Sequence, residues 1–207
     1  MFGSKALNRV ITDFDIGIPE NWHLVDLADS TAAEWARATS SALATTDTSR
    51  IALSERLKAV FESLAGLGQP GLSAAVWVRA PDSGVVDAIL GIRMAQLDDG
   101  MDSAAYLAGL EEDEGRAQPG ERYQVVQTWT TPIDAGLAVG AYNRISHLEL
   151  GGDRVDVEER TVIAVFPPKS SQVIECVFTT AVPGTYDDII LETMAHVATM
   201  RIETAKA

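Results

Sequence analysis

The feature that most limits the fold of this chain is a run of four stretches in which apolar and polar residues tend to alternate. They read "RYQVVQTWTT", "GLAVGAYNRISHLEL", "RVDVEERTVIAVF" and "QVIECVFTTAV", all within residues 122–182. A period of two is typical of β-strands that bury one face, and short gaps between such strands favour hairpins. The second half of the chain is therefore predicted to form an antiparallel sheet.

The gap between the second and third of these stretches contains a pair of glycines. A two-residue turn at Gly151–Gly152 places Leu148 opposite Val155 and Glu149 opposite Arg154. Both pairs are chemically compatible across two strands, since one is apolar and the other joins opposite charges.

Further strands and two helices are expected in the first half of the chain. The stretches "RVITDFDIGIP" and "WHLVDL" indicate an opening extended pair, and "LSAAVWVRA" and "VVDAILGIRM" indicate two strands joined by a turn at "PDSG". Between these pairs, Thr31 and Glu34 form the T-x-x-E pattern of a helix capping box. A second helix follows, with an apolar stripe made of Leu53, Leu57, Val60, Phe61 and Leu64. It ends at "GLGQPG", which follows a helix and has no lysine, so it is interpreted as a cap and turn and not as a phosphate loop.

Two more helices are predicted towards the C-terminus. A short one covers Ser103 to Leu110, before an acidic loop from Glu111 to Gly120. A long one follows Thr185 and Asp188, which together resemble a cap, and has an apolar face made of Tyr186, Ile190, Met194 and Val197. Helices grouped around about six or more hairpin-linked strands predict an α+β fold, and 207 residues are expected to form a single domain, 1–207.

The single cysteine, Cys176, is interpreted as a core residue. In an extended strand it shares one face with Ile174 and Phe178, and no nearby residue supplies the positive charge that would stabilise a thiolate. One cysteine excludes an intramolecular disulfide, which fits a reducing cytoplasm. The N-terminal "MFGSKALNRVITDF" has no apolar run typical of a secretory signal, so we expect a cytoplasmic protein.

The charge of the chain argues against two classes of partner. Thirty acidic residues against sixteen basic ones give a formal net charge of −14, which repels nucleic-acid phosphates and anionic lipid surfaces. No stretch approaches the ~20 apolar residues that span a bilayer. We therefore expect no nucleic-acid and no membrane partner. The acidity itself is explained by solubility or, alternatively, by a basic protein partner.

The sequence offers no recognisable catalytic, cofactor or metal motif, so no catalytic, cofactor-binding or metal-binding residue is predicted. Its histidines are His23, His147 and His196, and none has metal-ligand spacing. His147 and Glu149 are predicted to share a strand face, most simply as a solvated hairpin end. Carboxylates cluster at two places, but their spacing does not match a calcium-binding loop: Asp98, Asp99 and Asp102, and Glu111 to Glu114.

Aromatic residues provide a weaker indication of a site. Trp77 lies on the strand face opposite Ala74, Val76 and Val78. If helices cover only one face of the sheet, Trp77 and Trp129 line a pocket or an interface; if they cover both faces, Trp77 belongs to the core.

The two ends of the chain resemble a known fold. The opening "FDIGIPENWHLVDL" and the closing "IECVFTTAVPGTYDDIILETMAHVATMRI" are similar to the PsbP-like fold. That fold is shared by the photosystem subunit PsbP, a Ran-binding nuclear import factor and several bacterial proteins. The resemblance implies an antiparallel sheet between helices and a protein that binds or scaffolds partners. Two helices inserted between Trp22 and Leu72 depart from the pattern, and no functional residue is carried over.

Two functions from different classes remain open. The first is a non-enzymatic cytoplasmic binding or adaptor domain that engages a protein partner, with homo-oligomerisation also open. The alternative is a small-molecule-binding protein or an enzyme with a cavity between the sheet and the long C-terminal helix.

Overall fold

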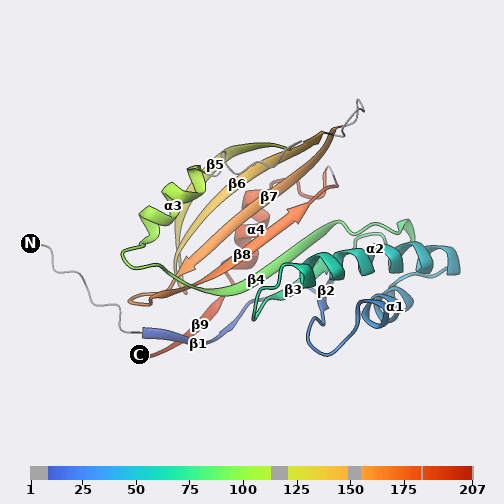
Figure 1. Cartoon of the computed structure of the whole chain (residues 1–207), viewed down its shortest axis with the longest axis horizontal. Helices are drawn as coiled ribbons and strands as arrows, with labels where there is room; N and C mark the ends of the chain where they lie inside the picture. Colours follow the sequence, from blue (N-terminus) through green and yellow to red (C-terminus); the bar gives the residue numbers. More distant parts are fainter. Residues whose placement is uncertain (1–8, 113–120, 149–154, 183, 207) are drawn as a thin grey trace, which may run out of the picture. The chain divides into compact units, whose positions relative to one another are not determined.

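The computed structural model describes residues 9–112, 121–148, 155–182 and 184–206 (Figure 1). The helices in this part of the chain are α1 (Ala32–Leu43), α2 (Asp47–Gly66), α3 (Ser103–Glu111), α4 (Ile189–Val197) and a 3₁₀ turn, η1 (Pro81–Ser83). The strands are β1 (Arg9–Asp15), β2 (Trp22–Val25), β3 (Ser73–Trp77), β4 (Ala88–Gln96), β5 (Glu121–Ile133), β6 (Gly136–Leu148), β7 (Val155–Phe166), β8 (Gln172–Thr180) and β9 (Arg201–Lys206).

Seven of the strands form one sheet in the order β2-β3-β4-β8-β7-β6-β5, and β1 and β9 form a second sheet of two strands. Neighbours run antiparallel in each pair whose register is described. The predicted α+β fold is therefore confirmed.

The chain divides into two compact units. One consists of Ile18–Ile92, and the other of Met1–Gly17 together with Arg93–Ala207. The boundary falls inside β4, which contributes its first residues to one unit and its last residues to the other. Whether the units unfold together, as a single domain would, remains a prediction.

In the unit formed by Ile18–Ile92, α1 and α2 pack against one face of the strands. The predicted capping box of Thr31 and Glu34 is present at the start of α1, and Thr46 and Ser49 form another at the start of α2. The predicted stripe of α2 is buried throughout, beside Val25, Trp35, Ala74 and Val76. The spacing of apolar residues was sufficient to predict the buried face of α2, because this helix buries a single face.

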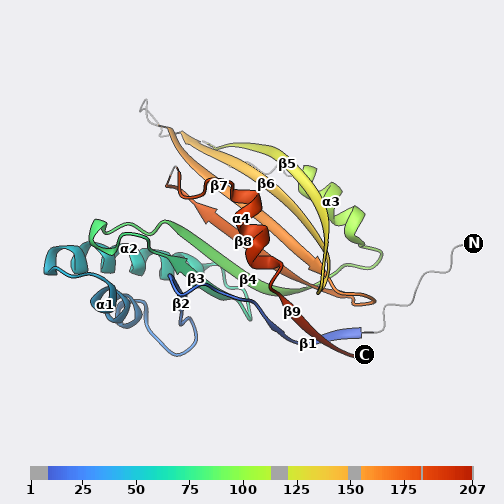
Figure 2. The same cartoon turned by 180° about the vertical axis from the view of Figure 1, so that it is seen from behind.

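In the other unit, α3 and α4 lie on opposite faces of the sheet formed by β5 to β8 (Figures 1 and 2). The rings of Phe178 on β8 and His196 on α4 stack with centroids 5.9 Å apart. The hydroxyls of Thr161 on β7 and Thr193 on α4 are 3.3 Å apart. Cys176 and Phe178 therefore lie on the face of β8 that is turned towards α4, whereas Glu175 lies on the face that is turned towards α3.

The predicted hairpin between β6 and β7 is confirmed in register. Leu148 pairs with Val155, and the ladder continues without a shift to Leu137 opposite Phe166. The expected turn at Gly151–Gly152 and the pair of Glu149 with Arg154 lie outside the described residues.

The C-terminal helix differs from its prediction. It is short, with nine residues, and its buried stripe is Ile189, Thr193 and Val197, whereas Ile190 and Met194 are only half-buried. Thr193 is tolerated inside because its hydroxyl donates to the carbonyl of Ile189 at 2.6 Å. Because the buried stripe contains the polar residue Thr193, the positions of the apolar residues alone predicted the wrong face of the helix.

The residues after α4 form a strand, β9, that was not predicted from the sequence. β9 pairs with β1, so the expected opening pair of β1 with β2 is wrong. Strand β2 pairs with β3 instead. Because β9 was not predicted, the true partner of β1 could not be predicted either.

Candidate binding cleft beside strand β9

A cleft of about 320 Å³ lies beside β9, and its lining belongs to one compact unit. Three segments build it: the turn between β5 and β6, the turn between β7 and β8, and the start of β9. The lining residues are Asp134, Ala135, Pro167, Pro168, Met200, Arg201, Ile202 and Thr204. Pro167 and Met200 are buried, whereas Asp134, Pro168 and Arg201 are exposed, so an apolar floor has a charged rim.

The turn between β5 and β6 is held by a close backbone approach. Ile133 pairs with Gly136, which leaves Asp134 and Ala135 as the loop. Gly136 has a φ of 146°, and a Cβ there would lie 2.1 Å from the carbonyl oxygen of Phe166. Only glycine fits this position, so this wall of the cleft has little freedom.

The turn between β7 and β8 is equally constrained. The N–H of Ser170 donates to the carbonyl of Pro167 at 3.2 Å, and Lys169 has a φ of 63°. A proline followed by a positive φ at the next residue is typical of a type II turn, in which a lysine is an uncommon choice. The carbonyl of Lys169 in turn accepts the N–H of Arg9 at 3.2 Å, which ties β1 to this turn.

The edge of β9 that faces away from β1 carries backbone groups that are not used in the ladder. Thr204 lies opposite Ile11, and the N–H of Ile11 donates elsewhere, to Oε1 of Gln172 at 2.7 Å. The pair is therefore of the non-hydrogen-bonded kind, in which N–H and C=O groups point away from the partner strand. The N–H and C=O of Thr204 thus lie on the outer edge of β9.

Ile202, two residues before Thr204 on β9, forms a pair of the same kind. Ile202 lies opposite Phe14, and the N–H of Phe14 donates to Oδ1 of Asp13 at 2.9 Å. Ile202 and Thr204 both line the cleft. Among the described residues, β9 pairs with β1 alone.

Arg9 supports this edge from within the two-stranded sheet. Its guanidinium donates to Oγ1 of Thr204 and to the carbonyl of Thr204, both at 2.7 Å. A carbonyl oxygen has two lone pairs and can accept a second hydrogen bond. The Thr204 carbonyl on the outer edge therefore already accepts one hydrogen bond within the chain.

Two carboxylates face one another on this sheet. Asp13 lies directly opposite Glu203, both side chains are exposed, and Asp15 follows two residues later along β1. Like charges directly opposite one another in a sheet are destabilising. Arg201 lies directly opposite Asp15 on the same face, so these three carboxylates have a cationic neighbour within the sheet.

The structure places Cys176 in the core, as predicted. The thiol is fully buried on β8, opposite Ile163. Burial, with a smaller contribution from the charge of Glu175, raises its pKa to about 12. A thiol in this state is not a nucleophile at neutral pH.

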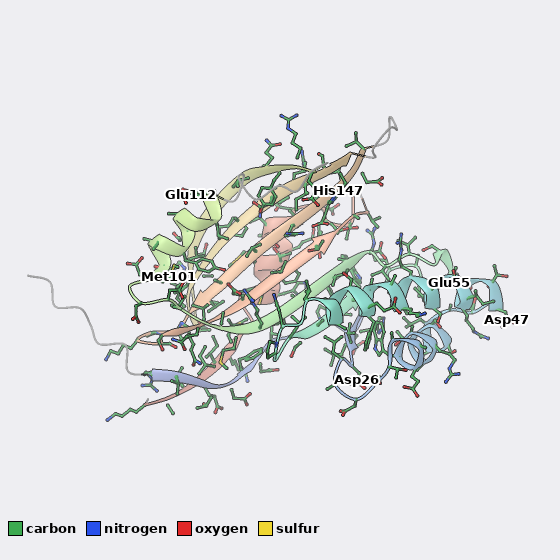
Figure 3. All side chains as sticks on the ribbon, in the orientation of Figure 1. Asp26, Asp47, Glu55, Met101, Glu112 and His147 are labelled. Atoms are coloured by element: carbon green, nitrogen blue, oxygen red, sulfur yellow. The ribbon has the colours of Figure 1, made fainter. Side chains whose placement is uncertain are left out.

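The histidines lie apart from the cleft. His147 is near the end of β6, at the opposite end from the turn that lines the cleft (Figure 3). Its ring nitrogens are 3.4 Å from a carboxylate oxygen of Glu121 and 3.6 Å from one of Glu158. The predicted partner, Glu149, lies outside the described residues. His196 is stacked on Phe178, and burial lowers its pKa, as it does for His23.

Two of the carboxylates singled out from the sequence, Asp102 and Glu111, form hydrogen bonds within the chain. Asp102 is the N-cap of α3 and accepts the N–H groups of Ala104 and Ala105. Glu111 accepts a hydrogen bond from Thr128 on β5. No group of three potential metal ligands occurs among the described residues, and 113–120 fall outside them.

The two tryptophans belong to packing and not to the cleft. Trp77 stacks on Trp22 with ring centroids 5.8 Å apart, and the guanidinium of Arg79 lies 5.4 Å from the Trp77 ring centroid. Trp129 covers Gly140 on the neighbouring strand.

Sequence reasoning missed one polar cluster on the face of α3. Glu175 on β8 accepts the hydroxyl of Tyr106 at 2.7 Å and also pairs with Arg93 on β4. The ring of Tyr106 meets Phe166 edge-on at 5.5 Å. The carboxylate is satisfied by two donors, so the cluster attaches α3 to the sheet. An acidic residue on a strand between apolar neighbours was its only signal in the sequence.

A second cleft, of about 240 Å³, lies between α1 and α2. Its lining is mostly polar: Arg37, Ser40, Ser41, Arg50, Ile51, Ser54 and Glu55. It lacks a strand edge and an apolar floor, so it serves below as a control surface.

No helix in the described residues is long and apolar enough to cross a membrane.

Comparison with known proteins yields similar structures but no sequence match. No protein-family model and no curated protein sequence matches the chain. The solved structures that it is similar to include cyanobacterial PsbP (CyanoP) from Synechocystis sp. PCC 6803, with 11% identity, 98% of this chain and 95% of that chain covered, and a TM-score of 0.49. LpqN, involved in cell envelope biogenesis of Mycobacterium tuberculosis, has 11% identity, 97% and 87% coverage, and a TM-score of 0.45. PA94, a protein of unknown function from Pseudomonas aeruginosa, has 18% identity, 54% and 70% coverage, and a TM-score of 0.38. The similar structures thus include a PsbP, a member of the fold that the two ends of the chain resemble.

Proposed function

We propose that this chain is a non-enzymatic binding domain of the cytoplasm that engages a protein partner through the cleft beside β9. The cleft of about 320 Å³ carries the proposal, because its buried floor, charged rim and strand edge occur together. An apolar centre surrounded by polar groups is the usual anatomy of a protein interface.

The turns on two sides of the cleft support this choice. Gly136 and Lys169 hold conformations that fix the loops around Ala135 and Pro168. A preformed site loses little entropy on binding, which favours recognition of an outside segment.

The alternative of a ligand cavity between the sheet and the C-terminal helix has less support. Thr161 and Thr193 meet across that interface, and His196 stacks on Phe178 there. The chemistry-bearing side chains are also engaged elsewhere, since Cys176 is buried and Glu175 is held by two donors. Catalysis is therefore not part of the proposal.

The compartment and the excluded partners follow from composition. A net charge of −14 disfavours nucleic acids and anionic membranes as partners. A single buried thiol is compatible with a reducing cytoplasm. A second copy of the chain is a further possible occupant of the cleft and is an outcome of the tests below.

A selection from a random twelve-residue peptide display library, with the purified chain as bait, tests the proposal. Ala135→Trp fills the cleft, and Ile51→Trp makes the same bulky change at the second cleft as a matched control. We expect enriched peptides to bind wild type and Ile51→Trp equally and to bind Ala135→Trp at least tenfold more weakly. Failure to enrich any peptide, or enriched peptides indifferent to Ala135→Trp, would overturn the proposal.

A further inference from the structure

The strand β5 forms one edge of the seven-stranded sheet, and among the described residues it pairs with β6 alone (Figure 1). Residues 123–133, which make up most of this strand, include no charged residue, although the chain carries a net charge of −14. An exposed strand edge without charges is a template for pairing with another chain. We infer that two copies of this chain pair antiparallel through the outer edges of their β5 strands. This inference goes beyond the proposed function, because it uses residues 127–131, none of which lines the cleft beside β9.

Pro132 shows which backbone groups of β5 point outward. Proline has no N–H to donate to a ladder, so within a sheet its nitrogen faces away from the paired strand. The direction of the backbone groups alternates along an antiparallel ladder, so the N–H and C=O of Thr130 and Thr128 also point away from β6. The pairing of β5 with β6 has no register shift between Gln127 and Ile133, so this alternation holds along the whole stretch.

The open part of the edge is short. It ends on one side at Pro132, which offers a carbonyl and no N–H, and on the other side at the bulge around Val126. Between them Gln127, Thr130 and Thr131 are exposed, so this part of the edge is not covered by the rest of the chain. A proline and a bulge are devices that limit edge pairing. They leave residues 127–131 open, and a contact of this size gives weak, concentration-dependent association.

A two-fold axis at Trp129 makes this stretch complementary to itself. It places Thr128 opposite Thr130 of the second copy, and each such pair exchanges two backbone hydrogen bonds. On the other face Gln127 lies opposite Thr131 of the second copy, and the two Trp129 rings are direct neighbours. Threonine pairs and aromatic pairs across antiparallel strands are favourable. An axis at any other residue of the stretch would place one of the outward threonines opposite Pro132, the bulge or the turn after β5.

The charges around the stretch are compatible with a second copy. The residues of β6 that pair with it, 138–142, are also uncharged. The charged residues that flank the stretch, among those described, are Glu111 and Glu112 at the end of α3, Glu121 and Arg122 at the start of β5, and Asp134 after it. Antiparallel pairing brings Asp134 towards the end of the second copy's strand that carries both a cation and an anion. No like charges therefore lie directly opposite one another across residues 127–131.

Glu111 is the charged group nearest to the proposed contact. It accepts a hydrogen bond from the hydroxyl of Thr128 at 3.0 Å, so the two copies bring their Glu111 carboxylates to the same face of the joined sheet. Together with the net charge of −14, these carboxylates oppose association at long range. Added salt screens this repulsion, so we expect the dimer to become more stable as the salt concentration rises.

Sedimentation velocity of the purified chain at a series of concentrations tests the association. We expect a monomer that converts to a dimer as the concentration rises from ~10 to ~500 µM, the range of a weak interface. Thr130→Pro removes the outward N–H, which the β5–β6 ladder does not use, whereas Thr130→Val keeps it. Thr130→Pro should weaken the dimer at least tenfold, and Thr130→Val should stay within threefold of wild type. Equal urea midpoints in the two variants would show that both fold alike.

Cross-linking in the wild-type backbone tests the register. Gln127→Cys and Thr131→Cys in one chain place thiols opposite one another between copies, at a non-hydrogen-bonded pair whose Cα atoms lie about 4.5 Å apart. Gln127→Cys with Thr130→Cys is the matched control, because these two side chains lie on opposite faces of β5. Mild oxidation should give a covalent dimer from the first pair and not from the control. The native thiol of Cys176 is fully buried and does not compete.

Each contrary outcome overturns the inference without touching the proposed function. A wild-type chain that stays monomeric at the highest concentration would show that β5 does not pair. A dimer that survives Thr130→Pro, or that weakens as salt is added, would place the contact elsewhere. A dimer that only Ala135→Trp abolishes would place the second copy in the cleft beside β9. Equal cross-linking of both cysteine pairs would show that the register is wrong. The peptide selection with Ala135→Trp tests the cleft independently of all these results.

Discussion

The indole of Trp129 covers Gly140, its direct partner across β5 and β6. A Cβ at Gly140 would lie 2.4 Å from Cζ2 and 2.5 Å from Cε2 of that ring. Glycine in a strand interior is otherwise unfavourable, and an aromatic neighbour that covers the exposed backbone compensates for it.

This contact predicts the effect of a single methyl group. Gly140→Ala should lower the free energy of unfolding by about 1–3 kcal/mol, because the ring must move to admit the new carbon. Urea denaturation measures the change. Gly140→Ala combined with Trp129→Leu should recover part of the loss, and a fully additive double variant would show that the two residues are not coupled.

The corrected face of α4 predicts which of its apolar residues matter. Ile189 is buried and Leu191 is 68% exposed. Ile189→Ala should cost about 2–5 kcal/mol, and Leu191→Ala should stay within about 0.5 kcal/mol. Thermal or urea melts compare the two variants with wild type. Equal losses in both would mean that α4 packs through another face.

Burial of His196 predicts that stability falls in mild acid. Burial lowers its pKa from the ordinary value of 6.5, with a smaller opposing effect from Glu192, so the folded state favours the neutral ring. The unfolded chain therefore takes up a proton first, and stability present above pH 6.5 is lost as the pH falls towards the folded pKa.

The measurement is the urea midpoint at a series of pH values from 7.5 to about 5. His196→Phe keeps an aromatic ring against Phe178 and should flatten the profile over this range. A residual slope is expected from His23, whose pKa is also lowered by burial. An identical profile in the variant would contradict the prediction.

The thiol of Cys176 should react slowly in the folded protein. It is fully buried, and its pKa is raised to about 12. Titration with an aromatic disulfide reagent at pH ~8 should show slow labelling that becomes rapid in denaturant. Rapid labelling without denaturant would show that β8 is accessible.

Cys176 and Trp35 report on different units, which allows the predicted single domain to be tested. Trp35 belongs to Ile18–Ile92, and Cys176 lies in the other unit. A variant that retains Trp35 as its one tryptophan should show the same urea midpoint by fluorescence and by thiol exposure. Two separated midpoints would show that the units unfold independently.

The sequence by itself determined the elements whose signal is local. The capping box of Thr31 and Glu34, the stripe of α2 and the pairing of Leu148 with Val155 follow from spacing along the chain. The burial of Cys176 was predictable for the same reason, because both of its flanking same-face residues are large and apolar.

The candidate site required the tertiary structure. β9 is a six-residue strand directly after a helix, and its partner β1 is about two hundred residues away along the chain, so no local pattern links Ile11 with Thr204. The cleft depends on that pairing and on turns around Ala135 and Pro168 that meet only when the sheet is complete. Local periodicity predicts on which face of a helix or strand a residue lies. Contacts between distant segments form only when the packed core brings those segments together.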